Sequence, residues 1–231
     1  MRHTNHAPSE MGRLGSPGRS TSVFEFAFSR RRRASAHVLI LACAAVWTSP
    51  TTLTAGAGPR IALAVRVYQT AGLPFALEQR ALAEAEAVLR AGLVEVRWQG
   101  CTGPNPSPIC TLPPGPSELL LVVRAGDPCH QDPSATLGAA FVAPRAGGVL
   151  ATVYVSCVES LAMAARADVA VLLGRVVAHE LGHLMMRTPG HAHRGLMRPH
   201  WTPNEIRRNL PADWVFTAGD VAAMHQPGHS Y

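Results

Sequence analysis

One segment combines residue types and a spacing that could support chemistry: His179-Glu180-Leu181-Gly182-His183. On a helix, residues four positions apart lie on one face, one turn above the other. Two imidazoles so placed can bind a single ion through one nitrogen each, at roughly 2.0–2.1 Å for zinc. Glu180 lies about 100° round the helix from His179. It would therefore flank the ion without binding it, and could act as a general base toward a metal-bound water.

This segment lies in a stretch without proline, residues 168–187, where apolar residues occur all round the helical wheel. That pattern predicts a buried helix rather than a surface helix. Asp168 is the expected N-cap, and Thr188-Pro189-Gly190 should end the helix. Polar groups on a buried helix cost free energy unless they are compensated. A metal ion would compensate them; the alternative is a metal-free core helix whose polar groups are satisfied by hydrogen bonds.

A third metal ligand must come from beyond this helix. Because each helical residue rises about 1.5 Å, a straight continuation would carry later side chains away from the ion. The chain therefore has to turn back, and Pro189-Gly190 supply a turn directly before His191, the expected third ligand. His193 is the competing imidazole. A carboxylate ligand is the other alternative, and the acidic residues downstream of the motif are Glu205, Asp213 and Asp220.

The remaining sequence predicts an α+β fold. Alternating or short apolar runs indicate strands at 60–69, 94–98, 119–124, 138–142 and 149–158. Helical spacing of apolar residues predicts a second long helix at 74–91. Short helices are expected around 203–209 and from Thr217, as N-cap, to about residue 225. We find no internal repeat, so residues 58–231 are expected to form a single catalytic domain.

The first 57 residues have the pattern of an N-terminal extension with a signal peptide. A basic cluster, Arg30 to Arg33, precedes an apolar run at 36–47 that is too short to span a bilayer. Ala55-Gly56-Ala57 is a small-x-small cleavage pattern, so we expect cleavage after Ala57. A buried N-terminal helix is the alternative interpretation, and a lipoprotein signal at Cys43 is a weaker one.

The net charge of +6 in a chain of 231 residues invites a nucleic-acid interpretation, but its distribution argues against one. Residues 1–57 hold seven of the 21 basic residues and two of the 15 acidic residues, which leaves a net charge of +1 for the remainder. That remainder has no basic stripe with interleaved aromatic residues, so nucleic acid is not an expected partner. We expect a secreted, periplasmic or extracellular monomer that is free of the membrane after signal cleavage.

The cysteines agree with export. Removal of Cys43 with the leader leaves an even number, which suits two disulfides in an oxidising compartment. We favour Cys101–Cys110, because it would close a loop at 100–117 that contains six prolines, and Cys129–Cys157. The alternative is a second zinc site, which lacks any paired Cys-x-x-Cys spacing.

Residues 179–199 resemble the metzincin zinc endopeptidases, and the matrixins in particular. That family has His-Glu-x-x-His, a glycine turn, a third histidine, and then a Met-turn beneath the metal. Leu196-Met197-Arg198-Pro199 looks like the Met-turn, with Met197 as its methionine. The resemblance implies a mixed twisted sheet packed on two long helices, one bearing the zinc motif, followed by a small irregular C-terminal part with short helices.

The spacing departs from that family. In the pattern His-Glu-x-x-His-x-x-Gly-x-x-His, the glycine and the third histidine would fall at Met186 and Pro189. Here they are Gly190 and His191, so the glycine comes four residues late and the histidine two. A longer helix before the turn could absorb this difference. The family's tyrosine after the Met-turn, a fifth ligand in some members, has no counterpart soon after Met197.

The expected function is that of a secreted zinc endopeptidase acting on peptides or proteins. Three neutral imidazoles leave one position on Zn²⁺ open for a water whose pKa falls to about 7. Glu180 would take the water proton and later protonate the leaving amine. The resemblance implies a substrate extended along an edge strand, for which 149–158 is the candidate; the alternative is that this strand is interior. The alternatives are a zinc-binding secreted protein of this fold without turnover, a zincin with a carboxylate third ligand, and a structural secreted domain with metal-free histidines.

Overall fold

The structure is a computed structural model that describes residues 60–115, 117–126, 136–143 and 147–226. The leader predicted at 1–57 lies outside these residues. The export signal, the cleavage after Ala57 and the division of the chain at that point therefore stay predictions. Within the described residues the chain folds into five strands with intervening helices, so the fold is α+β, as predicted.

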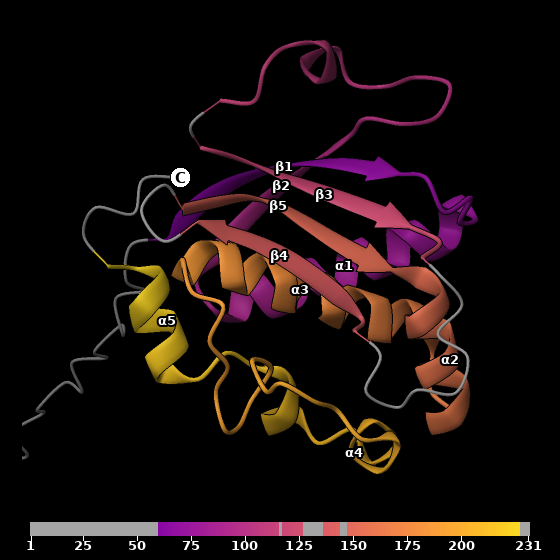
Figure 1. Cartoon of the computed structure of the whole chain (residues 1–231), viewed down its shortest axis with the longest axis vertical. Helices are drawn as coiled ribbons and strands as arrows, with labels where there is room; N and C mark the ends of the chain where they lie inside the picture. The colour runs from indigo at the N-terminus through magenta and orange to yellow at the C-terminus, as the bar shows by residue number, and fades with distance from the viewer. Residues whose placement is uncertain (1–59, 116, 127–135, 144–146, 227–231) are drawn as a thin grey trace, which may run out of the picture. The chain divides into compact units, whose positions relative to one another are not determined.

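The strands form one mixed sheet in the order β2-β1-β3-β5-β4. Their bounds are β1 Ile61–Gln69, β2 Val94–Gly100, β3 Glu118–Arg124, β4 Gly138–Ala143 and β5 Gly147–Tyr154. The pairs β1–β2, β1–β3 and β3–β5 are parallel, whereas β4 runs antiparallel to β5 at one edge of the sheet. Figure 1 shows this edge strand lying over helix α3 (Val169–Met186), which carries the His-Glu motif.

The strand predicted at 149–158 is wrong in length and in place. β5 ends four residues earlier, where helix α2 (Val155–Ala165) begins, and it lies between β3 and β4 rather than at an edge. Val155 and Cys157 continue the alternation of a strand in the sequence, but Val155 and Val158 also lie on one face of a helix, and the fold buries both. The edge strand beside the motif helix is therefore β4.

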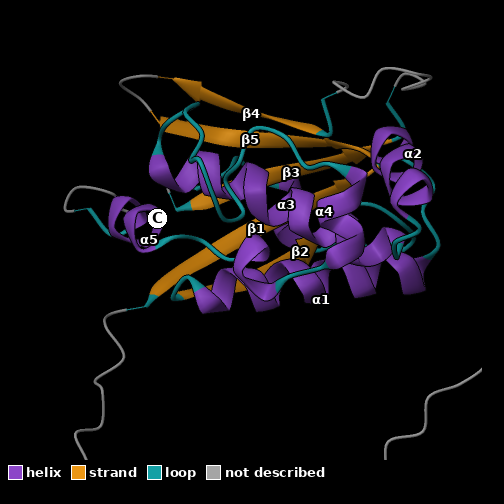
Figure 2. Ribbon diagram, turned by 90° about the horizontal axis from the view of Figure 1, so that it is seen from below, coloured by secondary structure: helices purple, strands orange, loops and turns teal. Residues whose placement is uncertain are grey.

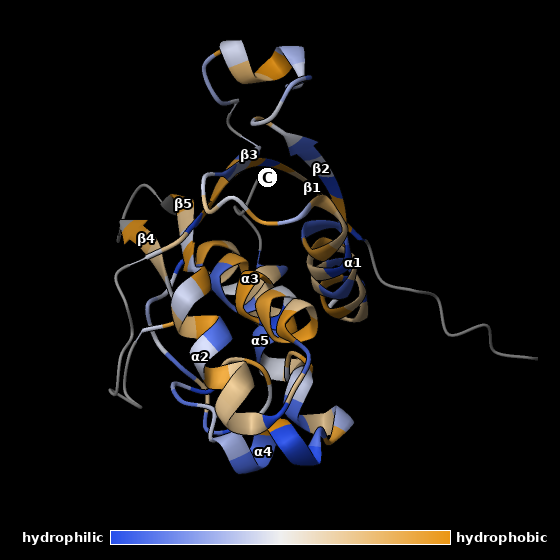
Figure 3. Ribbon diagram, turned by 90° about the vertical axis from the view of Figure 1, so that its right-hand side faces the viewer, coloured by the Kyte–Doolittle hydropathy of each residue, from blue (hydrophilic) through white to orange (hydrophobic). Residues whose placement is uncertain are grey.

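Two long helices, α1 (Phe75–Ala91) and α3, pack on one face of the sheet and confirm the two helices predicted from periodicity (Figure 2). Asp168 caps α3 as predicted, since its side chain accepts hydrogen bonds from two backbone N–H groups. In Figure 3 α3 is coloured mostly as apolar, whereas α1 carries both apolar and polar residues. Among helices in the described ranges, only α3 is long and apolar enough to cross a membrane, but 89% of it is buried inside the fold, as in a core helix.

The two long helices meet at Gly174 of α3. A Cβ atom at this position would lie 2.4 Å from the backbone oxygen of Ala81 and 2.7 Å from Cβ of Glu84. Glycine is intrinsically unfavourable inside a helix, and this close approach explains why it stands here. Beside it, Arg175 reaches across to Glu84, with Nε and Oε1 3.1 Å apart.

We expect Gly174→Ala to destabilise the protein, although alanine is normally the better helix former. The added methyl group would press on the backbone of α1, and overpacking of this kind costs about 1–3 kcal/mol. Gly219→Ala is the matched control, because a Cβ there would meet only Oγ1 of Thr217, at 3.7 Å. Urea denaturation measures both variants. An unchanged midpoint for Gly174→Ala would contradict the helix packing described above.

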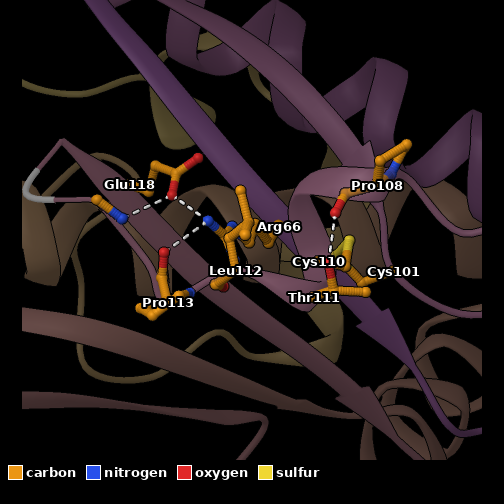
Figure 4. Close-up of polar contacts among 9 residues, drawn as sticks. Arg66, Cys101, Pro108, Cys110, Thr111, Leu112, Pro113 and Glu118 are labelled. Carbon is orange, nitrogen blue, oxygen red and sulfur yellow. Dashed lines mark hydrogen bonds and ion pairs between the residues drawn. A yellow bond between two sulfur atoms is a disulfide. The ribbon is translucent and has the colours of Figure 1, made fainter.

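The proline-rich loop between β2 and β3 lies on the face of the sheet opposite α1 and α3 (Figure 1). The predicted disulfide Cys101–Cys110 closes this loop, with Cα atoms 5.5 Å apart. Arg66 of β1 is fully buried beneath it and donates a hydrogen bond to the carbonyl oxygen of Leu112 at 2.6 Å (Figure 4). Its guanidinium also pairs with Glu118. The loop is thus fixed both to the sheet and to itself.

Only one cysteine of the second predicted disulfide lies within the described residues. Cys157 is disulfide-bonded. Cys129 lies outside the described residues, so the Cys129–Cys157 pairing stays a prediction.

The chain after α3 is irregular, with short helices as predicted. They are α4 (Pro203–Arg208), a 3₁₀ turn η2 (Pro211–Trp214) and α5 (Ala218–Met224). Both α-helices begin with a capping box, Thr202 with Glu205 and Thr217 with Asp220, which satisfies their first backbone N–H groups. These caps let two very short helices form and hold the segment between them.

Candidate metal centre

Two imidazoles face each other across one turn of α3. The Nε2 atoms of His179 and His183 lie 3.1 Å apart, and the ring centroids 4.7 Å apart. Both side chains are buried. The two rings therefore converge on one point, as the four-residue spacing predicts.

The other nitrogen of each ring decides the tautomer. Nδ1 of His179 lies 2.9 Å from the carbonyl oxygen of Leu196, and Nδ1 of His183 lies 2.9 Å from that of Thr188. Because a carbonyl oxygen only accepts hydrogen bonds, each Nδ1 carries the proton and each Nε2 presents a lone pair. Burial lowers the pKa of His179 to about 3 and also lowers the pKa of His183, which keeps both rings neutral.

The facing pair therefore fits a cation. Two lone pairs 3.1 Å apart repel each other unless a positive charge lies between them. A proton is disfavoured there by the lowered pKa values of both histidines. A metal ion satisfies both lone pairs, and the Nδ1–H to carbonyl bonds are the outer contacts that orient metal-binding imidazoles.

A third imidazole completes the donor set. The ring of His191 has its centroid 4.7 Å from that of His183 and 5.4 Å from that of His179. One nitrogen from each of the three rings lies within 4.8 Å of the other two. Three imidazoles with an open position are typical of catalytic zinc. This donor set supports Zn²⁺ as the cofactor.

The turn that returns His191 does not use a glycine. α3 ends at Met186, and Arg187 adopts the left-handed backbone conformation, with φ 53°. Thr188 then donates its backbone N–H to the carbonyl oxygen of His183 at 3.2 Å and accepts from Gly190 N–H at 3.0 Å through its side chain. The turn at Arg187 and the hydrogen-bonded segment after it explain why His191 comes two residues later than the third histidine of the metzincin pattern.

The competing ligands lie elsewhere. His193 is exposed and does not belong to the metal-binding group found among the described residues. Glu205 closes the capping box of α4 and accepts from Arg198, whose Nη1 also lies 3.2 Å from Asp213. Asp220 closes the capping box of α5. Each carboxylate thus has a structural partner away from the imidazoles.

Met197 lies directly beneath the motif helix. Its side chain is fully buried, and a Cβ on Gly182 of α3 would come within 2.8 Å of its sulfur. The turn around it is closed by a hydrogen bond from Ala192 N–H to the carbonyl oxygen of Met197 at 2.8 Å. The preceding residue, Leu196, holds the ring of His179. Met197 thus packs against the helix that carries the predicted ligands, and its role as the methionine of a Met-turn stays a prediction.

Glu180 is buried beside the imidazoles, and burial raises the pKa of its carboxyl to about 8. It packs against Gly138, the first residue of β4: a Cβ there would lie 2.7 Å from Oε1 of Glu180 and 2.8 Å from the carbonyl oxygen of Thr152. The sequence analysis missed Gly138. A glycine opening a predicted strand was the available signal, but its contact with Glu180 depends on long-range packing.

A cavity of about 820 Å³ opens over the metal centre. The three histidines and Glu180 line its polar part. Helices α2 and α3 supply an apolar wall, which includes Leu161, Ala164 and Val176. The sequence left open whether His200 and Trp201 line a pocket, and both prove to lie on its wall.

Two tryptophans support the centre from the side. The ring of Trp201 meets that of His179 edge to face at 5.5 Å and that of Trp214 at 5.3 Å. The Arg175 guanidinium lies 4.2 Å from the centroid of Trp214. Sequence analysis did not single out Trp214 or Arg175. A lone charge within an otherwise apolar helix was the signal that could have drawn attention to Arg175.

No protein-family model matches the chain, and neither does any curated protein. One similar solved structure is that of a zinc-dependent peptidase from Methanocorpusculum labreanum, with 19% identity over 70% of this chain and 100% of that one, and a TM-score of 0.47. So weak a likeness does not establish a family. The interpretation of the site therefore rests on its own geometry.

Proposed function

We propose that the chain is a zinc-dependent endopeptidase of the metzincin type that hydrolyses peptide bonds outside the cytoplasm. The observation that supports this most strongly is the pair of facing Nε2 lone pairs on His179 and His183, with His191 beside them and Glu180 next in the helix. Buried imidazoles locked in this tautomer favour a resident cation over a metal-free core. The neighbouring carboxylate gives such a site a base.

In this proposal the chain's own residues bind the metal ion, orient the substrate and transfer one proton. A bound Zn²⁺ supplies a Lewis acid for the substrate carbonyl and acidifies a water. His179, His183 and His191 would hold the ion, and all three line the cavity. Glu180 accepts the water proton and returns it to the amine that leaves. Its raised pKa belongs to the metal-free state, because a nearby cation favours the carboxylate.

The substrate is proposed to lie along β4. This strand forms the edge of the sheet nearest the motif helix, and Gly138 at its start touches Glu180. An extended peptide can pair with such an edge through backbone hydrogen bonds. The scissile carbonyl would then lie beside the base. β4 replaces the interior strand β5 in this role.

Export is part of the proposal and rests on the leader pattern. The Cys101–Cys110 disulfide supports it, because disulfides persist in oxidising compartments. We therefore propose a periplasmic or extracellular location. We also propose that the protein is a monomer and that its substrate is a polypeptide. N-terminal sequencing of the protein recovered from such a compartment tests the cleavage after Ala57.

Substitution of Ala164 tests the apolar wall of the cavity. We expect Ala164→Phe to lower kcat/KM about 10- to 100-fold for peptides with a large apolar side chain next to the scissile bond, because the ring fills the space that such a side chain would use. Peptides with glycine or alanine at that position should be cleaved almost as before. Cleavage of a matched peptide set measures the ratio.

Met163→Phe is the control for that substitution. Met163 is the preceding residue of α2, is 76% exposed and does not line the cavity. A selectivity change of equal size in both variants would mean that α2 acts through stability rather than through the wall.

Metal removal tests the function as a whole. Purified protein should contain one zinc ion per chain and cleave casein or a peptide library, lose cleavage after chelation, and regain it when Zn²⁺ is restored. Stoichiometric zinc without cleavage would support the zinc-binding protein without turnover. Absence of zinc from the freshly purified protein, and failure to bind it when it is added, would support the metal-free structural domain.

A further inference from the structure

A fourth imidazole, that of His200, lines the cavity over the metal centre without joining the three-nitrogen group. Its side chain is exposed. The question is what an imidazole at this place can do for the proposed reaction.

Residues on both sides of His200 in the chain are held in place by their side chains. Two residues earlier, Arg198 is anchored by Glu205 and Asp213, each at 3.2 Å from its Nη1. Directly after it, the buried ring of Trp201 packs edge to face on His179 at 5.5 Å. A residue between two such anchors cannot move far from the metal ligands.

Hydrolysis creates a charge that needs a hydrogen-bond donor. When the water oxygen bonds to the carbonyl carbon, the π electrons move onto the carbonyl oxygen and make an oxyanion. The ligands His179 and His183 already give their N–H groups to carbonyl oxygens, and Glu180 is an acceptor. The donor to the oxyanion must therefore be another group on the cavity wall.

Most donors on the cavity wall are committed or out of reach. Ser160 donates its hydroxyl to a backbone oxygen of its own helix, and Thr202 donates to Glu205. The indole N–H of Trp201, and Nε and Nη2 of Arg198, have no hydrogen-bond partner, but all three are buried from solvent. Apart from His191 and Thr202, the exposed side chains with an N–H or O–H on the described cavity wall are Thr136 and His200. His200 is the one next in the chain to Trp201, which contacts the ring of His179.

We propose that His200 is a catalytic residue whose ring N–H donates a hydrogen bond to the oxyanion of the tetrahedral adduct, an inference that rests on the proposed peptidase function. A neutral imidazole has one N–H donor, so this role needs no change of protonation. No proton passes to or from His200. The adduct collapses by breaking the C–N bond, and the amine takes its proton from Glu180.

Replacement of His200 by alanine in the zinc-loaded protein tests this. We expect kcat to fall about 10²-fold, as on loss of an oxyanion donor, with little change in KM or zinc content. Affinity for a phosphinic peptide, whose anionic tetrahedral centre imitates the adduct, should fall by a similar factor in calorimetry. Affinity for the corresponding amide peptide, measured in a Glu180→Gln background, should not change. His200→Gln, which keeps an N–H donor, should recover part of the loss.

His193→Ala is the matched control, since this exposed histidine is outside the metal-binding group, and it should leave all five measured quantities unchanged. Unchanged kcat and phosphinic-peptide affinity in His200→Ala would overturn the inference while leaving the peptidase function intact. Loss of zinc would also overturn it, by making His200 a ligand. If the wild type cleaves nothing, the peptidase function fails, and the role of His200 as an oxyanion donor fails with it.

Discussion

Replacing Glu180 with glutamine should reduce peptide hydrolysis about 10²- to 10⁴-fold while zinc stays bound. Glutamine has the shape of glutamate and fills the same space against Gly138, but its amide cannot accept and return a proton. The three imidazoles are untouched. kcat and zinc content, measured on the same preparation, separate the lost base from a lost metal. Retention of more than a tenth of the activity would show that Glu180 is not the base.

Glu180→Gln should also change how the stability of the metal-free protein depends on pH. Burial raises the pKa of Glu180 from 4.5 to about 8. The folded state therefore holds its proton more tightly than the unfolded state, and wild-type stability is lost as pH rises from about 4.5 to about 8. Glutamine does not titrate, so Glu180→Gln should become the more stable protein across that window. Parallel unfolding curves at each pH, after chelation, measure the difference.

Local periodicity predicted much of the site. The all-round apolar pattern of α3 is visible without any long-range information, and so is the capping residue Asp168. Four-residue spacing then aligns His179 with His183, because helix geometry is regular. The same regularity puts Glu180 next to them. These features depend only on residues that are close together in the sequence, so they could be predicted without knowing the fold.

Features that depend on non-local packing could not be predicted in the same way. Strand order is set by pairing between distant segments, so the sequence did not show that β5 is interior and β4 is the edge. Gly138 meets Glu180 only after β4 pairs with β5 and the sheet packs on α3. Likewise Trp201 reaches His179 only because the irregular C-terminal part folds back under the helix. Such contacts have no sequence period.

The third ligand lies between these two cases. A turn after α3 was evident from Pro189 and Gly190, but which histidine it would return depended on the unusual conformation of Arg187 and on the link from Thr188 to His183. The structure brings His191 to the pair and leaves His193 outside it. This assignment is open to a direct experiment.

His191→Ala should weaken zinc binding by about 10²-fold or more, a larger loss than that of an outer-shell contact. The ring of His191 is exposed and lies outside the core, so its loss should leave the fold intact. The remaining pair of buried imidazoles still attracts the ion, but two ligands hold it less tightly than three. Competition with a chromophoric chelator measures the affinity, and circular dichroism checks the fold.

His193→Ala and Glu205→Ala complete the comparison. If His191 is the third ligand, both variants keep zinc, and Glu205→Ala loses only the cap of α4 and one partner of Arg198. If instead His191→Ala keeps its zinc and Glu205→Ala loses it, the carboxylate-ligand alternative is correct. In that case the ion would carry less positive charge, because a carboxylate would replace a neutral ring. It would then acidify water less strongly, so the rise of activity with pH would come at a higher pH than for a site with three imidazoles.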